Sequence, residues 1–448
     1  MEKAKSQIIR FIDLFAGIGG IRLGLEEASK ALGYDTLCVF TSEIKPHAIS
    51  VLKQNHPNEE ITGDITLDEN LKKIPSFDIL CAGFPCQAFS AAGNRDGFAD
   101  ETRGTLFFYV ANILREHKPK GFILENVEGL VNHDGGNTLR VIHNTLTRIG
   151  YVVSYKVLNS KDFGVPQDRK RIYIVGYYVG EGKCSKAKKV SLDNFPVTHN
   201  TLSSIIESGH PVSESAFISK LLSLYSVDEL QGKSIKDKRG GDSNIHSWDL
   251  EVKGAVSDEE KQFLNKLMKE RRKKKWASII GIDWMDGMPL TESQIREFYD
   301  TPNLKSILKK LTKQGYLRFE HPKKKVVTKH TAPNGKVVET SRRIPDTSKP
   351  KGYNIVAGKL SFEVGKVLSP NEIAPTLVAT DMHHLFVVDG QGIRQLSLSE
   401  GLKLFGYPEG YKFDIPTASG YDLLGNTVVV PVIKAVAYRL LEHIYPKV

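Results

Sequence analysis

The feature that most constrains the fold of this chain is a regular alternation of strand-like and helix-like segments along residues 8–178. The strand-like segments are short apolar runs, namely residues 8–15, 36–40, 77–83, 120–124, 152–157 and 171–176. Stretches with apolar residues at helical spacing separate most of these runs, namely residues 21–32, 106–117 and 137–149. Such alternation is typical of helices packed on a mainly parallel sheet. The sequence therefore predicts an α/β domain at the start of the chain.

The alternation stops near residue 180, and this change predicts the domain organisation. A chain of 448 residues is long enough for two or three domains. Residues 180–390 lack the alternation and hold most of the lysine-rich runs, whereas a final stretch, residues 430–445, is apolar enough to dock on a core. We expect an α/β domain of residues 1–180, completed by residues 420–448, and a second, irregular domain of residues 181–419.

The net charge of +10 is concentrated in one short stretch. Residues 301–350 contain 13 Lys and Arg against 3 Asp and Glu, whereas residues 1–150 contain 16 against 19. A local basic surface suits a polyanion, because phosphate contacts release counterions. A solvated loop without a partner has the same composition, so charge alone leaves both interpretations open. Residues 290–320 contain two short helical patterns and then an extended one, which fits a winged-helix-like module or two surface helices with no role in DNA binding.

Cysteine content and hydropathy bear on the compartment. The four cysteines, Cys38, Cys81, Cys86 and Cys184, are too few and too scattered for a disulfide framework, which favours a reducing, cytoplasmic setting. No unbroken apolar run reaches about 18 residues, so we expect no membrane span. The first residues lead directly into the first strand-like run, without the pattern of a signal peptide.

A glycine-rich turn follows the first strand-like run in the segment IDLFAGIGG. Gly17, Gly19 and Gly20 let the backbone approach a ligand without Cβ clashes, although a tight turn alone has the same pattern. Glu43 ends the next strand-like run, where a carboxylate can accept hydrogen bonds from ribose hydroxyls, and Asp64 follows a third segment. No lysine lies near the glycine turn, so a nucleoside without a phosphate chain fits better than NAD or ATP. This pattern favours S-adenosylmethionine as the cofactor.

A cysteine suited to nucleophilic attack follows the strand-like run FDILCAG, in the segment GFPCQAFS. Cys86 is therefore expected in a loop at the carboxyl edge of the sheet, where open α/β sheets bind ligands. Pro85 restricts the backbone before the thiol, and Gly83 allows a sharp turn. Cys81 lies within the strand and is expected to be a small buried hydrophobe. No Cys or His lies close enough in sequence to complete a metal site with this pair, and we expect no metal.

Two further charged groups are expected at the same edge of the sheet. Glu125 ends the strand-like run KGFIL, and the segment QDRKR places Gln167, Arg169 and Arg171 at alternate positions before RIYIVG. On an extended chain these three side chains would point the same way. Each group alone is compatible with a surface ion pair, but their common location favours a site. Arginines in such a site suit a carbonyl oxygen, a carboxylate or a phosphate.

A thiol, a carboxyl and an arginine together suit methylation of cytosine at C5. This carbon is a poor nucleophile until a thiolate adds at C6 and makes the ring enamine-like. A carboxylic acid near N3 stabilises the charge that develops there, and an arginine near O2 holds the ring. A base inside a duplex cannot reach such a pocket, so it must be flipped out.

At these residues the sequence resembles the bacterial cytosine C5 DNA methyltransferases of type II restriction–modification systems. The resemblance rests on DLFAGIGG, FPCQAFS, RGTLFF, ENV and QDRKRIYIVG, and near the end on RQLSLSEGLKLFGYP and GNTVVVPV, in the family's order. It implies a Rossmann-like S-adenosylmethionine-dependent methyltransferase domain and a smaller, irregular target recognition domain for double-stranded DNA. Residues 91–103 correspond to the family's catalytic loop, in which Gly93 and Gly97 suit closure. Arg95 is a candidate phosphate contact, and a solvated loop arginine is equally compatible.

The resemblance also assigns roles to single residues. It implies that Cys86 is the nucleophile, that Glu125 binds N3, and that Arg169 and Arg171 hold the cytosine or organise Glu125. The residues implied in cofactor binding are Phe15, Gly17, Gly19, Gly20, Glu43, Asp64, Pro85, Leu106 and Asn426. Phe15 would stack on the adenine of the cofactor, and Asn426 would support the cofactor pocket.

Together these patterns predict a sequence-specific DNA cytosine C5-methyltransferase in the bacterial cytoplasm, acting beside a cognate restriction endonuclease. Two alternatives stay open: an RNA cytosine C5-methyltransferase, and a DNA-binding homologue that has lost catalysis. The long second domain argues against the first alternative. The intact segments PCQ, ENV and QDRKR argue against the second.

Overall fold

The computed structural model describes residues 8–85, 106–237, 244–281, 287–331, 337–356 and 362–446, with side chains of 329–341 left out. The chain forms two compact units. Unit 1 consists of Met1–Ser208, Ser369–His383 and Leu396–Val448, and unit 2 consists of Gly209–Leu368 and His384–Gln395. These limits differ from the expected ones at 180 and 420.

Backbone pairing explains why the segment around residue 374 belongs to unit 1. The N–H of Ala374 donates to the carbonyl of Pro166 at 2.8 Å, and the N–H of Asp168 donates to the carbonyl of Ala374 at 2.8 Å. The segment therefore pairs with the chain just before the last strand of the main sheet. Such pairing between distant segments leaves no periodic pattern in the sequence.

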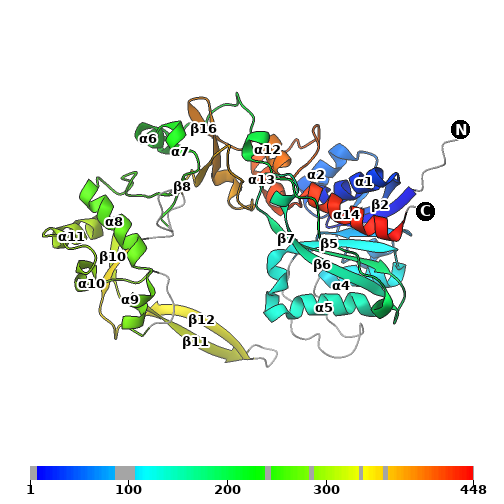
Figure 1. Ribbon diagram of the computed structural model, residues 1–448, viewed down its shortest axis with the longest axis horizontal. Coiled ribbons are helices and arrows are strands. Elements are labelled where there is room, and N and C mark those ends of the chain that lie inside the picture. The colour runs from blue at the N-terminus through cyan, green and yellow to red at the C-terminus, as the bar shows by residue number, and fades with distance from the viewer. Residues whose placement is uncertain are drawn as a thin grey trace. The chain divides into compact units, whose positions relative to one another are not determined.

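Unit 1 is built on a seven-stranded sheet with the strand order β3-β2-β1-β4-β5-β7-β6 (Figure 1). Its strands are β1 (Ile8–Leu14), β2 (Asp35–Ser42), β3 (Ile61–Thr62), β4 (Ile79–Ala82), β5 (Gly121–Val127), β6 (Tyr151–Asn159) and β7 (Lys170–Tyr178). The first five strands in this order pair in parallel, whereas β7 pairs antiparallel with both β5 and β6. The predicted α/β domain with a mainly parallel sheet is confirmed.

Helices cover both faces of this sheet (Figure 1). The helices of unit 1 are α1 (Gly20–Leu32), α2 (Pro46–Asn55), α3 (Asp68–Leu71), α4 (Leu106–His117), α5 (Asn137–Arg148), α12 (Leu398–Leu404), α13 (Thr417–Asn426) and α14 (Val430–Ile444), of which α12 and α13 pack against each other and not on a face of the sheet. Ile12 and Leu14 of β1 share an apolar core with α4 and α5. Helices α1 and α14 pack against each other so closely that a Cβ at Gly24 would lie 2.5 Å from Cγ2 of Ile433. Glycine is therefore required at this helix crossing.

The C-terminal helices form a long apolar stretch. The stretch Thr417–Ile444, which spans α13 and α14, is long and apolar enough to cross a membrane, with a mean hydropathy of 1.4 in its most apolar window. However, 67% of that window is buried inside the protein. Burial of this extent is what a core helix shows, and residues 430–445 were expected to dock on the core.

Unit 2 contains two apolar cores. The first lies between α6 (Ala216–Leu224), α7 (Val227–Leu230) and a five-stranded sheet of the order β16-β15-β14-β8-β9. The strands of this sheet are β8 (Ser234–Ile235), β9 (Asn244–Ile245), β14 (Lys366–Leu368), β15 (Leu385–Asp389) and β16 (Gly392–Gln395).

The second core of unit 2 is formed mainly by helices, and we call this part the helical module. Its elements are α8 (Asp258–Glu270), α9 (Lys274–Ile279), α10 (Glu292–Arg296), α11 (Leu304–Gln314), β10 (Leu317–Glu320), β11 (Lys323–Thr331), β12 (Val337–Pro345) and β13 (Gly352–Ile355). Trp248 and Trp276 are among its largest buried side chains. The module therefore has a core of its own.

Candidate active site

The glycine-rich turn after β1 has a strained, open backbone. Phe15 has a φ of 54°, and Gly17 and Gly19 have φ values of 57° and 76°, all in the left-handed region. A Cβ placed on Gly17 would meet nothing within 4 Å. The turn therefore leaves free space at Gly17, and the ring of Phe15 is only partly buried. Left-handed backbone at a residue with a large side chain is typical of ligand sites.

Glu43 lies directly after β2 and holds the same turn in place. One carboxylate oxygen accepts the N–H of Gly17 at 2.7 Å, and the other accepts the N–H groups of Ile44 and Lys45 at 2.8 Å each. A carboxylate offers about four acceptor positions, so one remains after these three bonds. Glu43 thus connects the ends of β1 and β2 and keeps capacity for a hydroxyl donor.

Gly19 and Gly20 are more crowded than Gly17. A Cβ on Gly20 would lie 2.7 Å from both the hydroxyl of Tyr407 and Cγ2 of Val428. The sequence predicted that all three glycines leave room for a ligand. At Gly20 the space is filled by side chains of the C-terminal segment, so its small size serves packing in this structure.

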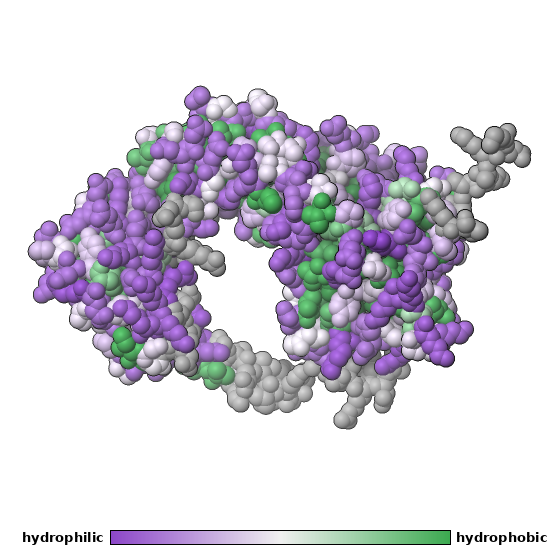
Figure 2. Space-filling view, viewed as in Figure 1, coloured by the Kyte–Doolittle hydropathy of each residue, from purple (hydrophilic) through white to green (hydrophobic). Residues whose placement is uncertain are grey.

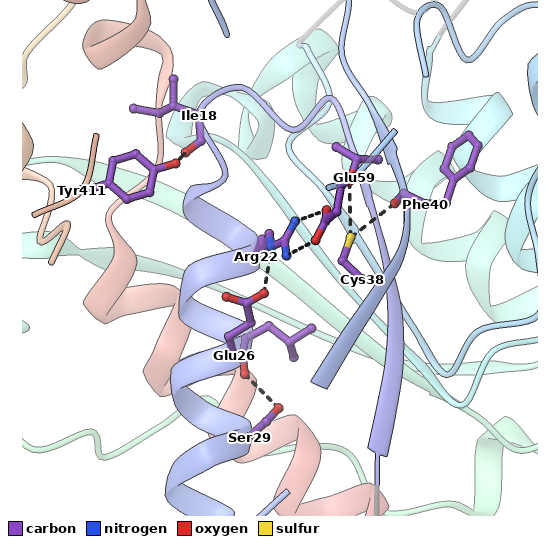
Figure 3. A network of polar contacts seen from close by, with 10 residues as sticks. Ile18, Arg22, Glu26, Ser29, Cys38, Phe40, Glu59 and Tyr411 are labelled. Atoms are coloured by element: carbon purple, nitrogen blue, oxygen red, sulfur yellow. Dashed lines mark hydrogen bonds and ion pairs between the residues drawn. The ribbon is translucent and has the colours of Figure 1, made fainter. Parts of the chain in front are cut away.

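Arg22, two residues into α1, fixes the start of this helix through a polar network (Figure 3). It donates to both carboxylate oxygens of Glu59 at 2.5 and 2.6 Å and to Glu26 at 2.8 Å. The hydroxyl of Tyr411 donates to the carbonyl of Ile18 at 2.6 Å. The helix that carries the glycine turn is therefore held from two sides.

The other expected cofactor residues lie at the periphery of the described structure. Asp64 is exposed, and its carboxylate accepts the N–H of Thr66 at 2.8 Å. Pro85 is exposed in the segment after β4, and Leu106 lies in α4. Asn426 is exposed at the end of α13, where its amide donates to the carbonyl of Asp422.

Cys86 and the loop of residues 91–103 lie outside the described residues, whereas the chain up to Pro85 is described. The amide of Asn126 in β5 donates to the carbonyl of Phe84 at 2.8 Å, and this bond is buried. It ties the ENV segment to the backbone two residues before Cys86. Cys81, in contrast, is buried within β4, and burial raises the pKa of its thiol well above the usual value.

Glu125 and Arg171 form a pair at the same edge of the sheet. Nε of Arg171 lies 3.3 Å from Oε1 of Glu125, and both side chains are largely buried. A Cβ on Gly83 would lie 3.9 Å from Oε2 of Glu125, so the end of β4 lies beside this carboxyl. Burial raises the pKa of Glu125, although Arg171 and Arg169 oppose the rise. A carboxyl in this state holds a proton more readily than an exposed one and can donate it.

Arg169 contacts the backbone of distant segments. Its guanidinium donates to the carbonyls of Leu377 at 2.7 Å, Gly425 at 3.1 Å and Thr427 at 2.8 Å. Burial, with the charge of Arg171 adding to it, lowers the pKa of Arg169 to about 10. The sequence predicted that Arg169 and Arg171 point the same way, but only Arg171 forms an ion pair with Glu125 among the described residues. Arg169 instead positions the two residues that flank Asn426.

Two residues at this edge were not singled out by the sequence analysis. Asn126 was quoted only as part of ENV, although its position two residues after a buried strand run could have indicated a polar contact. Asp13 lies in β1, is fully buried, and neither carboxylate oxygen has a hydrogen-bond partner among the described residues. Burial raises the pKa of Asp13 to about 8. An acidic residue in IDLFAG could have been recognised as out of place within an apolar run.

Comparison with known proteins agrees with this geometry. The family model of C-5 cytosine-specific DNA methylases matches residues 9–442. The chain is 60% identical to the type II methyltransferase M.NlaIV of Neisseria lactamica and 58% identical to M.NgoBV of Neisseria gonorrhoeae, each over 97% of this chain and 99% of the relative. It is 39% identical to M.HgiCI of Herpetosiphon aurantiacus, over 97% of this chain and 98% of the relative. The chain therefore belongs to the family of C-5 cytosine-specific DNA methylases and is a DNA (cytosine-5) methyltransferase.

Proposed function

We propose that this enzyme is the modification methyltransferase of a bacterial type II restriction–modification system, and that it acts in the cytoplasm on double-stranded DNA. The family and the names of its relatives support this role, which would protect the DNA at one short site from a cognate endonuclease. Unit 1 would carry the chemistry, and unit 2 would read the target.

The cofactor we propose is S-adenosylmethionine, bound at the ends of β1, β2 and β3. The free space at Gly17, the remaining acceptor position of Glu43 and the half-exposed ring of Phe15 fit a nucleoside without a phosphate chain. When bound there, S-adenosylmethionine supplies the methyl group that C5 takes, and it leaves as S-adenosylhomocysteine. The other residues assigned to this site are Gly19, Asp64, Pro85, Leu106 and Asn426.

The observation that carries the proposed chemistry is the buried Glu125–Arg171 pair beside the end of β4. We assign Cys86 as the nucleophile: its thiolate forms a bond to C6 and breaks the C5–C6 double bond. Glu125 donates a proton toward N3, and Arg171 orients Glu125 or holds O2 of the base. After methyl transfer a base removes the C5 proton, the double bond forms again, the thiolate of Cys86 leaves, and the proton on N3 returns to Glu125. Arg169 positions the segment around Asn426.

A covalent trapping experiment tests this assignment. The methylated site is first mapped by sequencing DNA from cells that express the enzyme, and a duplex with 5-fluorocytosine at that position is then offered. Fluorine blocks proton removal, so the wild-type enzyme is expected to stay bound to the DNA through Cys86, whereas Cys86→Ser forms no adduct. A Cys81→Ser control is expected to form the adduct. An adduct with Cys86→Ser would refute the nucleophile, and methylation of tRNA instead of duplex DNA would refute the substrate.

A further inference from the structure

The helical module of unit 2 has the element order of a winged-helix fold. Along the chain it runs α8, α9, a single-residue β-bridge at Leu290, α10, α11, β10, the hairpin β11–β12 and β13, so α9 is an addition to the winged-helix order. Leu290 and Tyr353 exchange two backbone hydrogen bonds, of 3.0 and 2.7 Å, which pair the segment at Leu290 with β13. β13 also pairs antiparallel with β10. In the sheet, β13 therefore lies between the segment at Leu290 and β10. This is the winged-helix order, in which the third strand lies between the first and the second. The hairpin β11–β12, which lies between β10 and β13 along the chain, is the wing.

One face of α11 is fixed to this module. Leu304, Ile307, Leu308 and Leu311 are buried in its core. On the same helix Lys310 donates to Glu260 of α8 at 2.8 Å. In helix-turn-helix proteins the helix at this position enters the major groove. The position of α11 in the module is therefore set by packing, which leaves its outer face for a partner.

The outer face of α11 is a row of lysines. Lys305, Lys309 and Lys313 are exposed at four-residue spacing, and within the described chain none of them forms an ion pair. Like charges at this spacing destabilise an isolated helix. Residues 301–319 contain no Asp or Glu at all, and the surface over α8, α10 and α11 is largely hydrophilic in the view of Figure 2. A polyanion would relieve this repulsion.

The wing carries charge of the same sign. β11 and β12 pair over nine positions and form a two-stranded sheet without a further strand. Lys325 lies opposite Arg343 in this register, and both side chains are exposed. The base of the wing is closed by the N–H of Asp346, which donates to the carbonyl of Pro322 at 2.7 Å.

We propose that this winged-helix module is the DNA-reading element of unit 2, with α11 in the major groove and the wing along the phosphate backbone. The proposal rests on the proposed function, since it names the part of unit 2 that meets the duplex. The exposed Ser306 and Lys309 are placed at the centre of α11, where hydrogen bonds to base edges would select the sequence. The flanking lysines would contact phosphates.

The salt dependence of DNA binding tests this proposal without turnover. The probe is a fluorescein-labelled duplex of 30 base pairs and mixed sequence, and its Kd is measured by anisotropy from about 50 to 300 mM salt. The α11 variant carries Lys305→Ala, Lys309→Ala and Lys313→Ala. Its matched control carries Lys186→Ala, Lys189→Ala and Lys220→Ala, three exposed lysines outside the helical module. A wing variant, Lys323→Ala with Lys325→Ala, provides a second test.

Each phosphate contact contributes about 0.9 to the slope of log Kd against log salt, so loss of the contacts of Lys305 and Lys313 in the α11 variant is expected to flatten the slope by about 2 units. Its KM for DNA is expected to rise on the order of 10- to 100-fold, with kcat at saturating DNA unchanged. Slopes equal to the control in both the α11 and wing variants would overturn the proposal, as would preferential displacement of the probe by duplex RNA. If the α11 variant shows no thermal unfolding transition, it is not folded, and the salt slope of the wing variant alone then tests the proposal. A wild-type enzyme that binds duplex with this slope but methylates no DNA would refute the proposed function alone.

Discussion

Charged side chains have opposite environments in the two units of this enzyme. At the carboxyl edge of the main sheet three of them are buried with partners, because Glu125 pairs with Arg171 and Arg169 donates to three carbonyls. On α11, Lys305, Lys309 and Lys313 are exposed and have no acidic partner among the described residues, whereas Lys310 of the same helix pairs with Glu260.

The difference teaches that chemistry and affinity depend on different physical effects in this protein. A buried charge is tolerated only with fixed partners, so the geometry around Glu125 is defined by its neighbours. An exposed lysine keeps its water, and its attraction for phosphate is screened by salt. Substitutions at the sheet edge should therefore reduce kcat, and substitutions on α11 should raise the KM for DNA.

The largest effect is expected for Glu125→Gln. Burial raises the pKa of this carboxyl, so it is held ready to give a proton to N3, and glutamine has no acidic proton to give. Loss of a general acid costs about 10²- to 10⁴-fold in rate. We expect a fall of this size in single-turnover methyl transfer, with the Kd for DNA and its salt slope unchanged.

The matched control for this prediction is Glu128→Gln. Glu128 lies three residues further along the chain but is exposed. It is expected to transfer methyl groups at the wild-type rate. A Glu125→Gln enzyme within about threefold of wild type in kcat, or one whose main defect is in DNA binding, would break the separation between the two units.

A second prediction concerns stability and pH in unit 1. Burial raises the pKa of Asp13 to about 8 from an ordinary value near 3.8, so the native state binds the proton more tightly than the unfolded state. The stabilisation is complete below about pH 4 and is lost as the pH rises to about 8, at up to about 1.4 kcal/mol per pH unit. Asp13→Asn has a neutral side chain at every pH, so its unfolding free energy is expected to fall much less over this range.

Denaturant unfolding at pH 5, 6, 7 and 8 measures this effect. Asp68→Asn serves as the control, because Asp68 is exposed in unit 1 and its replacement should leave the wild-type pH dependence intact. Glu125 contributes a smaller dependence of the same sign, since its pKa is also raised. Equal slopes for Asp13→Asn and Asp68→Asn would show that Asp13 is ionised in the native enzyme.

The fold of unit 1 was predictable because its pattern is local. The expected run 120–124 starts one residue before β5 (Gly121–Val127), and the expected run 171–176 falls within β7 (Lys170–Tyr178). The order of strand-like runs predicted that Glu125 and Arg171 lie at the same edge of the sheet. In the structure these two residues form an ion pair there. Short apolar runs therefore carried enough information to bring these two residues of the candidate site together.

The partners of Arg169 and the shape of the helical module were not predictable in the same way. Arg169 bonds to carbonyls 208 to 258 residues further along the chain, and a backbone acceptor leaves no mark in the sequence. The winged-helix order depends on Leu290 pairing with Tyr353, more than sixty residues away. A local pattern is present only in residues 290–320. This pattern fits both a winged-helix-like module and two surface helices with no role in DNA binding.

The smallest expected effect tests whether the two units are stabilised separately. Ser257 caps α8 in unit 2: its hydroxyl accepts the N–H of Glu260, and the Glu260 carboxylate accepts the N–H of Ser257 and the ammonium of Lys310. Ser397 caps α12 in unit 1 in the same way, together with Glu400. Removing either hydroxyl costs about 1 kcal/mol.

Hydrogen exchange of the two single variants distinguishes the units. Ser257→Ala is expected to speed exchange about fivefold in α8 and α11 and to leave α12 unchanged, because about 1 kcal/mol corresponds to that factor. Ser397→Ala is expected to do the reverse. In Ser257→Ala the KM for DNA should rise slightly, since the loosened module is the one we assign to the duplex, while kcat stays constant. Faster exchange in both units from either single substitution would mean that the two units open as one. The separate effects of substitutions on kcat and on the KM for DNA would then come from the side chains alone.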